Sequence, residues 1–379
     1  MDRRSFLQWG VGAAAWGGVT QLLRAGPPST AALSEVAFPP PVASVIPVVG
    51  DGVYVWNKPP EGQTGFLEPR SFEAMVGIEL EGRGNATELK AATPIPVECP
   101  EQKIDQEQIE TQGCEAEARQ LGPFARQLFL RASGIAKGQV ISAKARYKLT
   151  LYKQFENYHR EQFPERQAVP PAVQKQYLGD SPGIESRAPE VRQLLAKLSS
   201  GSEHPWDLAK KFADWIRGNV RPQIGSYIGV PKALHLRAGD CAEMSAIFVA
   251  LCRAAGIPAR LVWIPNHNWA EFFLADEKGA EHWIPVHTAC YFWFGWTGVH
   301  ELVIQKGDRI RFPEKNRYYR LLEDWLQWGG RRPESRYLAE LVPKPAKPGA
   351  DPGPGARRKT ASGEWQVVGK HPLDRYTRR

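Results

Sequence analysis

The body of this chain lacks net charge, although the 379 residues together carry a formal charge of +8. Residues 1–31 account for +2 and the tail from Lys344 to Arg379 for +6, which leaves the residues between them neutral. A neutral body has no broad electrostatic footprint for a phosphate backbone. The charge distribution therefore argues against nucleic acid as a partner.

Long apolar runs and internal repeats are also missing. After Leu23 no segment has the length and hydrophobicity of a membrane span, so only the N-terminus could serve as a membrane anchor. No self-similarity of solenoid period is visible. The chain does contain 42% hydrophobic residues and 13 Trp, and its length suits two packed domains.

Cysteine is scarce, and the count of 5 leaves at least one thiol unpaired or paired between chains. Cys99 and Cys114 lie close together in a segment rich in Pro and Gln. In an oxidising compartment these two could form a disulfide. The remaining thiols then need another explanation.

The N-terminus contains Asp2-Arg3-Arg4-Ser5-Phe6-Leu7-Gln8, followed by a mildly apolar run rich in Gly and Ala. This pattern resembles a bacterial twin-arginine export signal, and small residues suited to cleavage follow at 29–31. We predict that residues 1–31 are a signal peptide and that the protein is exported to the periplasm or cell envelope. An uncleaved signal would be its only membrane contact.

Period-two alternation marks the first domain. Six apolar residues alternate with polar ones between positions 141 and 151: Ile141, Ala143, Ala145, Tyr147, Leu149 and Leu151. Alternation of this length predicts a strand with one buried face and one solvent-exposed face. Further strand signals at 53–56, 72–80 and 125–130, separated by turn-rich connections, predict an antiparallel β-sandwich over residues 36–154.

Helical periods dominate the second domain. Residues 155–185 are polar and rich in Pro, and they are interpreted as a linker. Apolar residues at helical spacing then predict helices over 191–198 and from Pro205 to Ile216. The predicted fold is α+β, with the second domain at 186–341 and a disordered basic tail at 342–379.

A helix with clear boundaries begins at Cys241. Asp240 and Glu243 have the spacing of an N-cap and its reciprocal partner, and Gly256 followed by Pro258 ends the helix. Backbone N–H groups and the helix dipole at this end favour a thiolate and could stabilise an oxyanion. The alternative is that Cys241 is a small buried apolar residue, which is common for a free cysteine.

A histidine follows at a suitable place. The apolar run from Ala259 to Ile264 predicts a strand, and a second strand continues from Trp269 to Leu274. His267 lies at the start of this second strand, 26 residues after Cys241. From there its imidazole could face the helix N-terminus and act as the base for the thiol.

Four motifs follow one another in order: Gly239-Asp240-Cys241, residues 250–260, His267-Asn268-Trp269-Ala270-Glu271 and Trp283-Ile284-Pro285-Val286. Their order and spacing resemble the bacterial transglutaminase-like family of papain-type thiol enzymes. The resemblance implies a papain-like α+β domain, with Cys241 as nucleophile and His267 as general base. Many members carry a β-sandwich ahead of this domain, and no cofactor is expected.

The third catalytic position departs from the family pattern. Members usually have aspartate where this sequence has His287. A neutral His287 could accept a hydrogen bond from His267 and fix its tautomer, but it cannot stabilise an imidazolium as a carboxylate does. We predict an orienting role for His287, and a packed histidine is the alternative.

Three further features were considered. Cys241, His267, His287 and Cys290 contain zinc-ligand side chains, but their spacing is not that of a structural zinc site, so no metal is predicted. Trp269 and Trp283 could line a substrate groove, although large aromatics are more often core residues. Cys252, on the same helix as Cys241, is interpreted as packing.

The sequence thus predicts an exported thiol enzyme that forms a thioester at Cys241 from an amide substrate, such as a peptide or a cell-wall-associated amide. Hydrolysis is favoured over crosslinking because water needs no second binding site. The rival hypothesis is a noncatalytic module that binds a peptide or wall polymer, and the His at position 287 favours it.

Overall fold

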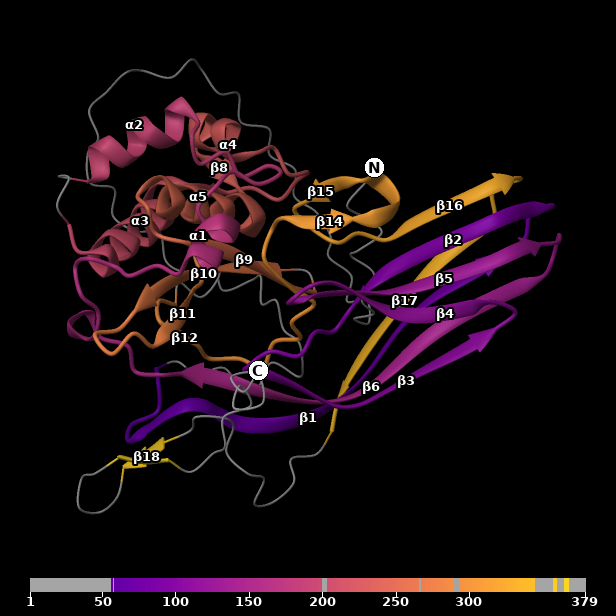
Figure 1. Ribbon diagram of the computed structural model, residues 1–379, viewed down its shortest axis with the longest axis horizontal. Helices are drawn as coiled ribbons and strands as arrows, with labels where there is room; N and C mark the ends of the chain where they lie inside the picture. The colour runs from indigo at the N-terminus through magenta and orange to yellow at the C-terminus, as the bar shows by residue number, and fades with distance from the viewer. Residues whose placement is uncertain are drawn as a thin grey trace, which may run out of the picture.

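The computed structural model describes residues 56, 58–199, 203–265, 267–289, 293–344, 357–359 and 365–367. These residues form an α+β structure rich in antiparallel strands, with the helices gathered at one end and long strands at the other (Figure 1). The expected signal peptide, the strand at 53–55 and most of the basic tail lie outside the described residues. No helix within the described ranges is long and apolar enough to span a bilayer.

The first sheet of the sandwich is built on two long strands. β1 (Gln63–Glu81) pairs antiparallel with β6 (Val140–Phe155) along nearly its whole length. β3 (Gln102–Gln112) extends the sheet beyond β6, and β17 (Glu334–Pro343) extends it beyond β1. The six alternating apolar residues of β6 are all buried, as predicted. Short strands also join this sheet: β12 (Trp296–Thr297), β18 (Arg357–Lys359) and β19 (Trp365–Val367).

The second sheet runs from the sandwich into the helical part of the molecule. Its sandwich strands are β4 (Glu115–Gly122), β5 (Ala125–Ile135), β2 (Ala86–Ile95) and β16 (Trp325–Gly330). Through β13 (Gln305–Lys306) the sheet continues into β9 (Ala259–Ile264), β10 (His267–Ala275) and β11 (Glu281–Val286). The two domains expected from the sequence therefore share one continuous sheet (Figure 1).

The chain returns to the sandwich near its end. β16 pairs with β2 and β17 pairs with β1, so residues 325–343 complete the two sandwich sheets. From the sequence, residues up to 341 were expected in the second domain. Which strands these residues pair with depends on the tertiary fold.

The helices surround one central helix, α5 (Cys241–Ala254), in which the residues from Ala242 to Arg253 are all buried. α5 packs on β9 and β10, and three helices pack around it: α2 (Pro189–Leu198), α3 (Pro205–Asn219) and α4 (Val230–Leu236). The predicted helices at 191–198 and 205–216 are confirmed. The remaining elements are short: α1 (Pro171–Tyr177), η2 (Arg160–Gln162), η3 (Pro313–Lys315), β7 (Arg221–Pro222), β8 (Ala238–Gly239), β14 (Ile310–Phe312) and β15 (Arg317–Tyr319).

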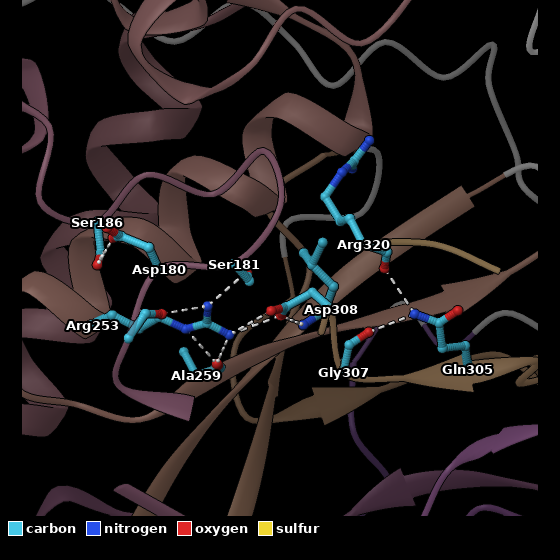
Figure 2. Close-up of polar contacts among 11 residues, drawn as sticks. Asp180, Ser181, Ser186, Arg253, Ala259, Gln305, Gly307, Asp308 and Arg320 are labelled. Atoms are coloured by element: carbon cyan, nitrogen blue, oxygen red, sulfur yellow. Dashed lines mark hydrogen bonds and ion pairs between the residues drawn. The ribbon is translucent and has the colours of Figure 1, made fainter. Parts of the chain in front are cut away.

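A buried ion pair anchors the C-terminal end of α5. Both carboxylate oxygens of Asp308 accept hydrogen bonds from Nη2 of Arg253 at 2.8 Å, and neither side chain is more than 1% exposed. Arg253 also donates to the carbonyl of Ala259 and to Oγ of Ser181 (Figure 2). Because its donors are shared among several segments, this arginine fixes α5 relative to β9 at the end opposite Cys241.

The suggested Cys99–Cys114 disulfide is not formed. Both thiols are free, and they lie at opposite ends of β3, which is 11 residues long. A strand of that length spans roughly 35 Å, far beyond the reach of a disulfide. Sγ of Cys114 instead donates to the carbonyl of Ser142 at 3.2 Å. The two residues are close in sequence, but the extended strand between them holds them apart.

Candidate active site

The N-terminal end of α5 has the predicted cap. The side chain of Asp240 accepts hydrogen bonds from the backbone N–H of Ala242, at 2.8 Å, and from that of Glu243. Glu243 in turn accepts from the N–H of Asp240 at 2.9 Å, which completes the capping box. Cys241 is the first helical residue and is half-buried. The N–H groups of Ala242 and Glu243 are used by the cap, so these two are not available to a substrate oxyanion.

Glu243 does more than cap the helix. Its side chain is 2% exposed, and Oε1 accepts a hydrogen bond from the N–H of Ile228 at 2.9 Å. Burial, followed by the nearby Asp240 carboxylate, raises the pKa of Glu243 to about 7. Gly239 is required beside it, because a Cβ at that position would lie 2.4 Å from Cβ of Glu243. The segment around Cys241 is thus packed tightly on both sides.

His267 is the first residue of β10 and is 5% exposed. Burial lowers its pKa to about 4, and the negative charge of Asp240 opposes this effect. The imidazole is therefore neutral at pH 7. Its Nε2 is buried and has no hydrogen-bond partner among the described residues. Burying a polar atom without a hydrogen-bond partner destabilises the folded protein. Such atoms are typical of side chains that have a chemical role rather than a stabilising one.

His287 follows β11 and lies next to His267. The two rings are 5.9 Å apart between centroids and inclined by 22°. His287 also stacks on Trp269 at 5.0 Å, and its Nε2 lies 3.3 Å from Oγ1 of Thr297. Burial, and to a lesser degree the charge of His267, lowers the pKa of His287. At neutral pH both histidines are thus neutral, in contrast to a histidine paired with a carboxylate.

The expected hydrogen bond between the two histidines is not made through Nε2 of His267, since that atom has no partner in the described part of the chain. His287 contacts His267 through a ring contact instead. The packing of His287 between two tryptophans, Trp269 and Trp293, holds its ring in place. An orienting role for His287 would therefore act by packing in this structure.

Polar contacts bring the segments that carry His267 and His287 to the start of α5. Oγ of Ser245, one turn after Cys241, lies 3.3 Å from the carbonyl of Asn268 and 3.3 Å from Oγ1 of Thr288. Asn268 and Thr288 each follow one of the two histidines. The electrostatic effect of Asp240 on His267 agrees with this placement. The structure therefore gathers the three sequence-predicted residues, Cys241, His267 and His287, at one end of the helix and sheet.

Trp269 and Trp283, suggested for a substrate groove, have other surroundings. Trp269 is 1% exposed, so its ring does not line an open surface. Trp283 is half-buried and pairs with Phe273 of β10. Phe273 lies six residues after His267, so Trp283 is roughly 20 Å along the strand from this histidine. Its ring packs against Tyr177 at 4.8 Å and beneath the guanidinium of Arg260 at 3.9 Å. Both tryptophans support the sheet on which the histidines lie.

Sequence reasoning missed an ionic network on the Trp269 face of β10. Nζ of Lys306 lies 2.5 Å from a carboxylate oxygen of Glu101 and 2.6 Å from one of Glu271. Arg260 is 2.6 Å from the other oxygen of Glu271, and all four side chains are almost fully buried. The network links the β2–β3 connection of the sandwich to the strand that carries His267. Glu271 is part of the recognised motif, but its partners are remote in sequence, so no local pattern reveals them.

The other thiols are remote from this chemistry or lie outside the described residues. Cys252 is fully buried within α5, and burial raises its pKa, which suits the packing role expected for it. Cys290 lies outside the described residues. Within the described ranges, no group of three or more His, Cys, Asp or Glu side chains is arranged to hold a metal ion.

Comparison with known proteins adds a family and a fold. Residues 192–288 match the family model of the transglutaminase-like superfamily. No curated protein is similar enough in sequence to match. A crystal structure from Cytophaga hutchinsonii, named a "putative cysteine protease", has a TM-score of 0.52 and 17% identity. The match covers 75% of this chain and 93% of that one.

A second solved structure, named a "putative protease" from Parabacteroides distasonis, has a TM-score of 0.24 and 12% identity, over 58% of this chain and 43% of that one. The first of these likenesses shows a shared fold and extends well beyond residues 192–288. It agrees with the expected arrangement of a β-sandwich joined to a papain-like domain, which is confirmed. The family match covers the cysteine and both histidines gathered at the start of α5.

Proposed function

Residues 192–288 form a transglutaminase-like domain, and from that premise we propose that the protein is a cysteine hydrolase that cleaves an amide bond through a thioester at Cys241. One observation carries the proposal: Cys241 begins a capped helix, and Ser245, one turn later, contacts the carbonyl of Asn268, the residue after His267 on β10. This arrangement supplies a nucleophile and a base from two separate segments of the chain.

The neutral state of His267 suits it to act as a base. Because the imidazole is neutral at pH 7, it can accept the thiol proton as the sulfur of Cys241 attacks the substrate carbonyl. The new carbon–sulfur bond gives a tetrahedral intermediate. As this intermediate collapses, the protonated His267 gives its proton to the departing amine and the carbon–nitrogen bond breaks. Water, deprotonated by His267, then hydrolyses the thioester and restores the thiol.

The low pKa of His267 also limits the reaction. An imidazolium is poorly stabilised at this site, since burial opposes its charge and position 287 provides no carboxylate. We therefore expect proton transfer to be concerted with attack, rather than a preformed thiolate and imidazolium pair. The resulting enzyme is slower at acidic and neutral pH than one with aspartate at position 287.

Hydrolysis is preferred to crosslinking in this proposal because water needs no second binding site. The substrate class is a peptide or a cell-envelope amide. This assignment rests on the N-terminal sequence, whose twin-arginine pattern is the reason to propose that the protein acts after export.

A noncatalytic binding module is the rival, and two observations favour it. His287 stands where an aspartate is usual, and His267 is only 5% exposed, so little of its ring is open to a substrate. In that case the buried histidines would be remnants of an active site, and the surface near Cys241 would only bind a peptide or wall polymer.

Alkylation of Cys241 by iodoacetamide between pH 6 and 8 distinguishes the two functions. We expect Cys241 to react at least about tenfold faster than glutathione at pH 7, because a positioned base typically contributes a factor of this order or more. The His267→Ala variant should lose this advantage. Mass spectrometry of the Cys241 peptide measures both rates.

His282→Ala is the matched control, since His282 lies on the neighbouring strand and pairs with Asp276. It should leave the rate unchanged. A wild-type rate no greater than that of glutathione, in a protein that is folded by circular dichroism, would favour the binding module.

A further inference from the structure

The loop between β7 and α4 is fastened to the start of α5 on both sides of Cys241. At one end, the N–H of Gln223 donates to the carbonyl of Gly239 at 2.9 Å. At the other end, the N–H of Ile228 donates to Oε1 of Glu243 at 2.9 Å. The two acceptors lie two residues before and two residues after Cys241. The loop is therefore held in a definite position relative to the thiol.

The β7–β8 pairing brings Ile224 of this loop near the start of α5. β7 and β8 are parallel, with Arg221 opposite Ala238 and Pro222 opposite Gly239. Ile224 directly follows Gln223, whose N–H is bonded to the carbonyl of Gly239, so it lies beside the segment that leads into Cys241. The segments that follow β7 and β8 leave the strand conformation here, but the two hydrogen bonds described above keep them together.

Ile224 is 86% exposed, whereas the other exposed large hydrophobic residues in the described part of the chain are 37–50% exposed. Single exposed apolar side chains are common and need no explanation by themselves. The position of this one matters, because its loop is bonded to the chain two residues before and two residues after Cys241.

The backbone at Ile224 also faces outward. The N–H groups of Arg221 and Gln223 donate toward the β8 segment, so by alternation the N–H of Ile224 points away from it. Pro222 has no N–H. An extended peptide could thus pair with the backbone at Ile224 while one of its side chains rests on the isoleucine.

We propose that Ile224 contacts the substrate and selects an aliphatic side chain next to the scissile amide. The inference rests on the proposed function and narrows its substrate class to peptides with an aliphatic residue at the cleavage point. Ile224 is a specificity-determining residue and takes no part in bond breaking.

The test compares two alkylating probes on Cys241. N-pentyl iodoacetamide and N-(2-ethoxyethyl)iodoacetamide have chains of equal length and differ by one methylene replaced with oxygen. In each case sulfur displaces iodide, a carbon–sulfur bond forms, and the thiol proton passes to His267 or to solvent. The ratio of the two rates, divided by the same ratio for glutathione, measures apolar selectivity without requiring a known substrate.

We expect a selectivity of about fourfold in the wild type, which is the ratio of rates that corresponds to the transfer free energy of one buried methylene group. It should fall to about one in Ile224→Ser and be largely retained in Ile224→Val. The matched control is Val342→Ser, because Val342 is an exposed aliphatic residue on β17 of the sandwich and is 49% exposed. This control should leave the selectivity unchanged.

A wild-type selectivity near one, or a selectivity that Ile224→Ser does not change, would overturn the inference. Since Ile224 is exposed, its replacement leaves the fold intact, and circular dichroism checks this. A different result would refute the proposed function. In that case iodoacetamide would alkylate Cys241 no faster than glutathione, whatever the selectivity between the two probes.

Discussion

Replacement of His287 by aspartate tests the electrostatics of the site most directly. His287 is 2% exposed and its ring centroid lies 5.9 Å from that of His267. A carboxylate at about this distance would attract an imidazolium by about 3 kcal/mol at an effective dielectric constant of 20. Such an attraction raises a pKa by about 2 units. The pKa of His267 would then move from about 4 toward 6.

A more basic His267 takes the proton from Cys241 more readily. A rise of about 2 units shifts the equilibrium between thiol and thiolate forms of the pair by up to about 100-fold. The buried carboxylate also loses hydration, which reduces the gain. We therefore expect His287→Asp to be alkylated about 10- to 100-fold faster than the wild type at pH 6.

The assay is the second-order rate of alkylation by iodoacetamide from pH 5 to 8, read by mass spectrometry of the Cys241 peptide. His287→Asn is the control, because it has the same shape as aspartate without the charge, and it should not accelerate the reaction. The electrostatic reasoning is wrong if a folded His287→Asp variant reacts at the wild-type rate or more slowly.

Three predictions concern stability, each measured by urea unfolding. Burial lowers the pKa of His267, so the unfolded chain binds more protons at this residue between pH 6.5 and 4. His267 should therefore contribute about 3 kcal/mol to the fall in the free energy of unfolding as the pH drops across this window, and the fall should be smaller by that amount in His267→Phe. An equal fall in both proteins would contradict this. Arg253→Met leaves Asp308 buried without its partner and should cost about 3–5 kcal/mol, whereas a loss below about 1 kcal/mol would show that the ion pair is not an anchor. Gly239→Ala forces its Cβ against Glu243 and should cost about 1–3 kcal/mol, and an unchanged midpoint would refute this crowding.

Local patterns predicted the elements of the candidate site well. The capping box at Asp240 and Glu243 and the helix end at Gly256, which has φ of +78°, are as expected. β9 has the predicted limits, and His267 stands at the start of β10. Caps and strand alternation depend on residues a few positions apart, so they can be seen in a single sequence.

Long-range contacts were not predictable in this way. The neutral state of His267 depends on burial by segments far away in the chain, and so does its ring contact with His287. The suggested disulfide is ruled out by the length of β3. Side chains such as Trp269 and Trp283 show the same limit, since composition does not reveal which of them are core residues.

The sequence by itself determined the long alternating strand at 141–151, the helices at 191–198 and 205–216, the cap that places Cys241 at a helix start, and the motifs by which residues 192–288 match the transglutaminase-like superfamily. The tertiary structure decided that one sheet runs through both domains and that residues 325–343 return to the sandwich. It also decided that the loop carrying Ile224 is bonded to the chain on both sides of Cys241. The reason is physical: local structure depends on neighbouring residues, whereas strand partners, burial and the pKa values that burial sets depend on which distant segments come together.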